Sequence, residues 1–189
     1  CFDAWVFPET IQSVDQGSGF RRVFVFSGDL NGSYRFLRDV DYVVSGIDLV
    51  KGGGMAPPEI RFESGSRLRF LPQGGVSISY GRIQAVGELE RPVYLGPFRE
   101  GMMWSGVDID SYSKGGLVRN VIIENARCYG NAGVCVGDID GQVVFENVKV
   151  LVIGNDVQSA IAYEEVVDVS VTNVDVLSSL RRVDVLREF

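Results

Sequence analysis

One eight-residue phrase occurs three times in this chain and constrains its fold more than any other feature. The copies are VIIENARC at 121–128, VVFENVKV at 143–150 and VSVTNVDV at 169–176. The fifth residue of every copy is Asn, and the copies lie 22 and 26 residues apart, at Asn125, Asn147 and Asn173. Self-similarity at a period of roughly 20–30 residues indicates a solenoid, because one repeat buries its apolar face only when neighbours stack on it.

The residues around each Asn predict a sharp bend in a strand. Before the Asn, apolar residues alternate with others at the period of two that is typical of a strand, and after it the alternation resumes one residue out of phase. Asn tolerates the left-handed backbone conformation that such a bend requires. Stacked copies then place Asn125, Asn147 and Asn173 in a hydrogen-bonded ladder. The alternative is a β-sandwich with three similar strands, which gives no reason for Asn at one phase of the pattern.

Length and composition favour a single domain, 1–189, and exclude several classes of partner and mechanism. The chain has 189 residues, of which 46% are hydrophobic. Its 25 acidic and 18 basic residues give a formal net charge of −7, so nucleic acid is not an expected partner. The absence of His from the sequence removes the commonest transition-metal ligand and the usual general base.

The three cysteines leave two questions open. Their spacing matches no zinc motif, and Cys128 and Cys135 either form a disulfide or are two buried thiols. Cys1 stands first, as in a bacterial lipoprotein after signal cleavage, so we expect it to carry the lipid of an outer-membrane anchor unless it marks an arbitrary fragment boundary. No apolar run has the length needed to span a bilayer, and no charged-then-apolar leader precedes Cys1.

The remaining sequence predicts short strands joined by tight turns. We expect residues 1–41 to form an N-terminal cap region and residues 42–189 to form the coils, with about five coils between residues 59 and 177. No segment shows a helical period with caps. Nothing near the C-terminus resembles a cap, which predicts either that the chain is truncated here or that another copy of the chain stacks on an open last coil.

Residues 42–109 resemble the opening coils of bacterial right-handed parallel β-helix proteins of the pectate-lyase-like superfamily. The "IEPGT-I-F" phrase of these proteins corresponds to the segment at 60–66, with Ser64 in place of Pro. Their "G-L-A-G-PI-F" and "W-GI" phrases are matched at Gly87, Pro92, Val93, Trp104, Gly106 and Val107. The resemblance implies an all-β fold, a right-handed parallel β-helix of three parallel sheets. It does not imply an enzyme, because many such proteins are adhesins, surface lipoproteins or structural parts.

The catalytic sets of the related enzymes are not found in this sequence. The hydrolases on this fold use a cluster of Asp that includes an adjacent pair, together with a His, whereas this chain has neither an Asp-Asp pair nor a His. The lyases hold their substrate through Ca²⁺ on several Asp. Asp108 and Asp110 form one i, i+2 pair, and Asp138 and Asp140 form another, so a weak Ca²⁺ site is predicted at Asp138 and Asp140, with a solvated polar face as the alternative. No catalytic residue is assigned.

Aromatic residues near successive turns provide a further hypothesis. Trp104, Tyr112 and Tyr129 could stack on sugar rings along one side of the coil, and core packing explains each of them equally well. The sequence therefore predicts a noncatalytic cell-envelope or extracellular protein that acts in adhesion, scaffolding or self-assembly, with surface polysaccharide as a candidate partner. The alternative is a polysaccharide lyase-like enzyme that acts on acidic polysaccharide.

Overall fold

The chain is built from strands alone in every part that the structure describes. The computed structural model describes residues 12–15, 21–25, 28–51, 56–129, 131–152, 157–164, 168–178 and 184–188. These residues form sixteen strands and no helix. Hydrogen bonds between neighbouring strands connect all sixteen in one continuous network. The described residues therefore also contain no helix with the length and apolar character needed to cross a membrane.

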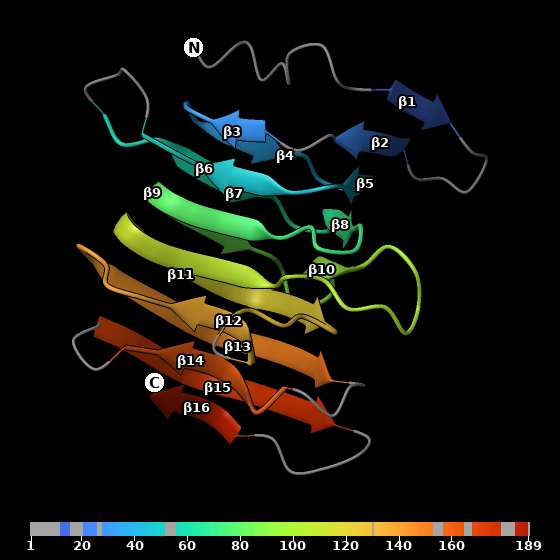
Figure 1. Cartoon of the computed structure of the whole chain (residues 1–189). Coiled ribbons are helices and arrows are strands. Elements are labelled where there is room, and N and C mark those ends of the chain that lie inside the picture. The colour runs from blue at the N-terminus through green and yellow to red at the C-terminus, as the bar shows by residue number, and fades with distance from the viewer. Residues whose placement is uncertain are drawn as a thin grey trace.

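The strands wind into a solenoid with three parallel sheets (Figure 1). Sheet 1 contains β2 (Arg21–Val25), β5 (Val40–Val44), β8 (Arg67–Phe70), β10 (Val93–Pro97) and the last parts of β11 (Val107–Glu124), β13 (Gln142–Val152) and β15 (Asp168–Ser178). Sheet 2 contains β3 (Gly28–Leu30), β6 (Ile47–Leu49), the first parts of β9 (Val76–Val86) and β11, then β12 (Ala132–Val136), β14 (Ser159–Tyr163) and β16 (Asp184–Glu188). Sheet 3 contains β4 (Tyr34–Phe36), β7 (Glu59–Phe62), the end of β9, the middle of β11 and the first parts of β13 and β15.

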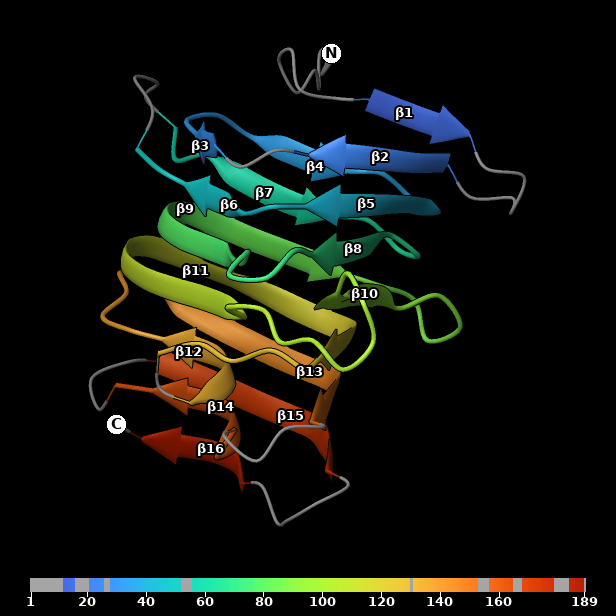
Figure 2. The ribbon, with the colours of Figure 1, turned by 45° about the vertical axis from the view of Figure 1, so that its right-hand side comes forward.

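The number of coils agrees with the sequence prediction. Between residues 59 and 177, sheet 3 contains β7 and parts of β9, β11, β13 and β15, which is one strand for each of about five coils. Upstream of residue 42, β2, β3 and β4 pair in parallel with β5, β6 and β7. The parallel stack thus includes part of the segment 1–41, where β1 (Gln12–Asp15) pairs antiparallel with β2 at the top of the stack (Figure 2).

Alternating apolar residues fill the interior of the coil. In β13, Val143, Phe145 and Val148 are fully buried, whereas Glu146 and Asn147 are both only half-buried. The buried positions therefore change phase by one residue at Asn147, as the sequence predicts. The backbone at Asn147 is left-handed, with φ of 53°, and Asn125 and Asn173 have φ of 51°. The predicted left-handed bend is confirmed at all three positions.

Two of the three predicted ladder residues are confirmed. Nδ2 of Asn173 donates to Oδ1 of Asn147 over 2.6 Å, and Nδ2 of Asn147 donates to Oδ1 of Asn120 over 3.1 Å. Nδ2 of Asn120 in turn donates to the carbonyl oxygen of Gly87 over 2.8 Å. A Cβ at position 87 would lie 2.4 Å from the carbonyl oxygen of Asn120, so the ladder ends on a residue that has to be glycine.

The predicted placement of Asn125 on the ladder is wrong. The strands pair Val121 with Val148, which brings Asn120 level with Asn147 and leaves Asn125 five residues further along the coil. Asn125 lies at the next corner, between sheets 1 and 2, where it is 2% exposed and its backbone N–H donates to the carbonyl of Leu151 over 2.8 Å. The ladder residues themselves lie on the outside of the bend, because Asn120 and Asn147 are half-buried and Asn173 is exposed.

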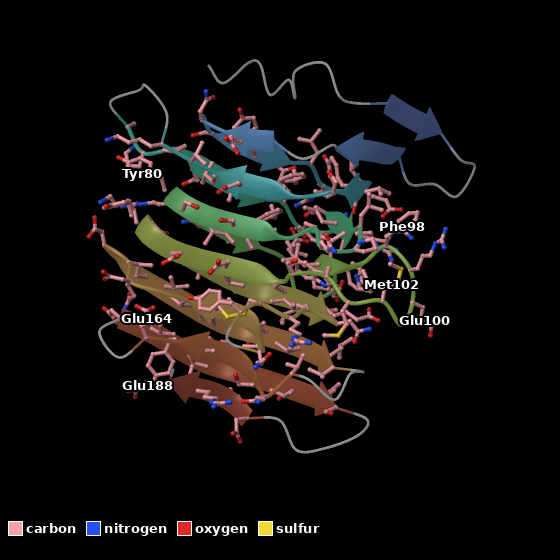
Figure 3. All side chains as sticks on the ribbon, in the orientation of Figure 1. Tyr80, Phe98, Glu100, Met102, Glu164 and Glu188 are labelled. Carbon is pink, nitrogen blue, oxygen red and sulfur yellow. A yellow bond between two sulfur atoms is a disulfide. The ribbon has the colours of Figure 1, made fainter. Side chains whose placement is uncertain are left out.

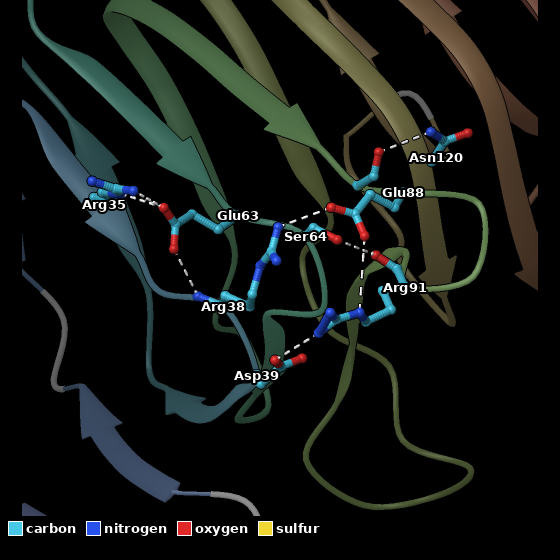
Figure 4. A network of polar contacts seen from close by, with 9 residues as sticks. Arg35, Arg38, Asp39, Glu63, Ser64, Glu88, Arg91 and Asn120 are labelled. Atoms are coloured by element: carbon cyan, nitrogen blue, oxygen red, sulfur yellow. Dashed lines mark hydrogen bonds and ion pairs between the residues drawn. The ribbon is translucent and has the colours of Figure 1, made fainter.

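Ion pairs occupy the same corner in the first coils (Figure 4). Arg38 pairs with Glu88 over 2.8 Å, Arg91 pairs with Asp39 over 2.9 Å, and Arg35 pairs with Glu63. These arginine side chains are 42–49% exposed, so each pair contributes little to stability in water. The corner between sheets 3 and 1 therefore carries charged pairs in the first coils and the Asn ladder after them, with Leu37 and Leu89 also exposed there.

The last coil is less completely covered than the coils before it. Val169, Val171, Val174 and Val176 of β15 are only partly buried, and Leu177 is 60% exposed. Among the described residues, β15 pairs only with β13, and β16 pairs only with β14, so the outer edges of both strands have no partner strand there. Edges of this kind offer backbone donors and acceptors to another strand.

Candidate functional site

A groove of about 630 Å³ lies on the outer face of sheet 2. Its lining comes from several successive coils and from the corner that precedes them, and it contains both polar and apolar groups: Asp29, Gly46, Ile47, Asp48, Gln73, Gly75, Val76, Ser77, Ser105, Gly106, Asp108, Arg127, Cys128, Tyr129 and Asn131. We refer to this hollow as the sheet 2 groove.

The register of the strands places three carboxylates in one outward column of the sheet 2 groove. Asp29 pairs with Asp48, Asp48 pairs with Ser77, and Ser77 pairs with Asp108. Neighbouring strands lie about 4.8 Å apart, so Asp48 and Asp108 are separated by about 10 Å along the stack. Ser79 donates from Oγ to Oδ1 of Asp48 over 3.1 Å and fixes that carboxylate.

Asp108 is the carboxylate with the most unusual surroundings. Its Oδ1 atom is buried and has no hydrogen-bond partner among the described residues. Burial, and then the negative charges of Asp110 and Asp48, raise the pKa of Asp108 to about 6. A carboxyl group with this pKa exchanges its proton within one unit of neutral pH, which is the range that acid–base chemistry and pH-dependent binding require.

The raised pKa of Asp108 predicts a pH-dependent effect of removing its charge. The folded chain binds the proton of the Asp108 carboxyl group more tightly than the unfolded chain does. The contribution of Asp108 to the free energy of unfolding therefore falls as the pH rises from about 4 to about 6. Asp108→Asn is therefore expected to stabilise the chain by about 1 kcal/mol near pH 7 and to have little effect near pH 4. The stabilisation near pH 7 is smaller than the pKa shift alone implies, because solvent partly screens this half-buried group. Urea unfolding at both pH values measures the difference. Glu100→Gln, in an exposed loop, is the control, and an equal gain at both pH values would contradict the prediction.

A disulfide holds one wall of the sheet 2 groove. Cys128 and Cys135 are joined, with their Cα atoms 6.0 Å apart, and both are buried beside Ala132 and Ala162. This settles the question that the sequence leaves open. The bond joins Cys128, which precedes Tyr129 in the chain, to Cys135 of β12.

Breaking this disulfide is expected to lower stability by about 2–3 kcal/mol, because it closes a short loop in the unfolded chain. Thermal melting with and without a reductant measures the loss. The double variant Cys128→Ala, Cys135→Ala is the matched control, since its melting temperature should not respond to the reductant. A parent protein that melts at the same temperature in both conditions would show that the bond contributes nothing.

The three aromatic residues singled out in the sequence have different environments. Trp104 is only 2% exposed, stacks on Phe70 and belongs to the core, so it is not a sugar platform. Tyr112 is 68% exposed but does not line the groove. Tyr129 is 55% exposed and lies in the groove wall. Partial burial, and then the negative charges of Asp108 and Asp110, raise the pKa of the Tyr129 phenol, which therefore stays protonated as a hydrogen-bond donor.

The residues predicted for Ca²⁺ lie in a turn outside this groove. Asp138 and Asp140 are both exposed and follow β12, and Oδ2 of Asp140 accepts a hydrogen bond from Nζ of Lys114 over 2.6 Å. In the part of the chain that the structure describes, no group of three or more His, Cys, Asp or Glu side chains is arranged to hold a metal ion. Ca²⁺ binding stays a prediction. Cys1, the predicted lipid attachment residue, lies outside the described residues.

Several lining residues were not singled out from the sequence. Asp29, Asp48 and Asn131 belong to no motif, and only the pairing of distant strands brings Asp48 into one column with Asp108. The loop after β10, which carries Phe98, Glu100 and Met102, projects from the edge of the stack (Figure 3). A second, smaller groove of about 360 Å³ lies beside the Asn ladder and includes Asn120, Asn147 and Asn173.

Comparisons with family models, with curated proteins and with solved structures give no match to this chain. The fold therefore rests on the strand pairing described above. The candidate function rests on the chemistry of the sheet 2 groove.

Proposed function

We propose that this chain is a noncatalytic β-solenoid of the cell envelope or extracellular space that binds a glycan along the sheet 2 groove. The observation that carries the proposal is the groove lining, which combines an exposed aromatic ring, Tyr129, with carboxylate, hydroxyl and amide groups. Sugar rings present apolar faces and hydroxyl edges, so they are bound by aromatic faces flanked by hydrogen-bonding groups. The rigid coil then serves adhesion or scaffolding.

Two further features support this proposal. The disulfide between Cys128 and Cys135 is typical of proteins from oxidising compartments, which favours a location outside the cytosol. The sequence phrases at 60–107 resemble those of the pectate-lyase-like superfamily. Together with the three parallel sheets, this resemblance supports the proposal that the chain belongs to that superfamily. Assembly of copies through the last coil is part of the proposal, because the outer edges of β15 and β16 can pair with a further strand, whether of the same chain or of another copy. Light scattering tests assembly, and a strict monomer at all concentrations would rule it out.

The glycan-binding proposal is tested with a paired tyrosine substitution. Tyr129→Ala is expected to weaken binding of oligosaccharides about tenfold, because an aromatic contact with a ligand face contributes of the order of 1 kcal/mol or more. Tyr112→Ala removes an equally exposed tyrosine outside the groove and is expected to leave binding unchanged. Titration calorimetry with a panel of neutral, acidic and amino-sugar oligomers measures both variants. Equal losses in the two variants, or binding by neither variant nor parent, would reject the proposal.

A carbohydrate-active enzyme is the second candidate, and Asp108 is the observation that favours it. Its carboxyl has a pKa of about 6, and Asp48 lies about 10 Å away in the same groove, near the upper end of the separation at which two carboxyl groups act on a sugar and a water. An acidic polysaccharide is the less favoured substrate, because Asp29, Asp48 and Asp108 would repel it. Incubation with neutral and acidic polysaccharides, with and without Ca²⁺, tests this candidate. New reducing ends or unsaturated products that Asp108→Asn abolishes would establish it.

A further inference from the structure

The charges that line the sheet 2 groove are unbalanced. Asp29, Asp48 and Asp108 face it, and Arg127 is the one cation among the described lining residues. The Arg127 side chain is exposed, and its Nε donates to Oδ1 of Asn131 over 3.2 Å, at the rim of the groove. Carboxylates lining a concave surface attract cations and repel anions, because the low-dielectric walls focus the field.

A second observation is independent of this charge count. The Oδ1 atom of Asp108 is buried in the groove wall and accepts no hydrogen bond from the described residues. A buried carboxylate oxygen without a donor disfavours the ionised form of the carboxyl group. A positively charged ligand group in the groove, beside the more accessible part of this half-buried side chain, would stabilise the ionised form through its charge.

We propose that the sheet 2 groove selects a glycan that carries free amino groups, in preference to neutral and uronic-acid glycans. This inference rests on the glycan-binding function proposed above. The sugar chain runs along the solenoid axis, because the carboxylate column of Asp29, Asp48 and Asp108 follows that axis. Ammonium groups of the sugar pair with Asp48 and Asp108, and one sugar ring lies against Tyr129.

Oligomers of glucosamine, N-acetylglucosamine and galacturonate, all of similar length, are positively charged, neutral and negatively charged in turn. Comparing them distinguishes a preference of the groove for positive charge from sugar binding in general. Titration calorimetry of the parent chain near neutral pH is expected to give the tightest binding for the glucosamine oligomer, about tenfold tighter than for the N-acetylated one. Added salt should weaken the glucosamine complex and leave the N-acetylated one unchanged. Asp48→Asn and Asp108→Asn should each reduce glucosamine binding about three- to fivefold without affecting the neutral oligomer. Glu100→Gln, outside the groove, should change neither.

The outcomes distinguish this inference from the function on which it rests. If the neutral or galacturonate oligomer binds as tightly as the glucosamine oligomer, and Tyr129→Ala still weakens it, the preference for amino sugars is overturned while glycan binding stands. If none of the three oligomers binds, both proposals fail. Melting temperatures of the Asn variants close to the parent value show that the comparison concerns folded protein.

Discussion

Replacing Trp104 by alanine is expected to lower the free energy of unfolding by about 3–5 kcal/mol. The indole is 2% exposed and is the largest fully buried side chain among the described residues. It stacks on the ring of Phe70 with centroids 4.2 Å apart, and its Nε1 donates to the carbonyl oxygen of Glu124 over 2.7 Å. The substitution therefore leaves a cavity between two coils and a buried carbonyl without a donor. Urea unfolding followed by circular dichroism measures the loss.

Two controls separate the packing of Trp104 from its hydrogen bond. Trp104→Phe keeps an aromatic ring on Phe70 but loses the N–H donor, so its loss should be about half that of the alanine variant. Leu89→Ala truncates a side chain that is 80% exposed and should change stability by less than about 0.5 kcal/mol. A Trp104→Ala variant as stable as Leu89→Ala would show that the indole is not in the core.

Replacing Asn147 by leucine is expected to lower the free energy of unfolding by about 3 kcal/mol. Asn147 is the middle residue of the ladder, so the substitution removes the hydrogen bonds to both Asn120 and Asn173, at about 1 kcal/mol each. Leucine also disfavours the left-handed backbone at this position, where φ is 53°, by about 1 kcal/mol. Thermal and urea unfolding measure the effect, and glycan binding by the sheet 2 groove should be unchanged in the folded variant.

Asn147→Gly separates the two contributions, because glycine adopts the left-handed conformation without strain but makes no side-chain hydrogen bond. We expect it to lie between the parent and Asn147→Leu. If Asn147→Leu melts like the parent, the ladder makes no contribution to stability. If the glycine and leucine variants are equally unstable, the backbone conformation is unimportant and the hydrogen bonds account for the whole loss.

The fold could be predicted because its signals are local and repeated. Alternation of apolar residues gives the strands, and a phase change at Asn147 gives the bend, and neither depends on knowing which strands pair. The ladder was harder to predict because the coil that contains β11 has more than one left-handed corner. Asn120 and Asn125 both have φ of 51°, and only the pairing of Val121 with Val148 shows that Asn120 is level with Asn147. The more even spacing of Asn120, Asn147 and Asn173 was the available clue.

The candidate site could be predicted only in part, because it is assembled across coils of unequal length. Asp108 and Tyr129 were singled out from the sequence, but Asp48 lies 60 residues before Asp108 and shares its column through Ser77. The irregular segment at 98–106 prevents the register from being counted along the chain. The sequence also does not show which aromatic residues are buried. Trp104 and Tyr129 were therefore both predicted as possible sugar-stacking residues, although Trp104 lies in the core and Tyr129 lies in the groove.

A crystal structure of the chain with a bound amino-sugar oligomer is the most direct test that the sheet 2 groove is the binding site. The proposal predicts sugar rings along the outer face of sheet 2, with one ring against Tyr129 and an amino group within hydrogen-bonding distance of Asp108. Sugar bound instead at the groove beside Asn120, Asn147 and Asn173, with the sheet 2 groove empty, would contradict it.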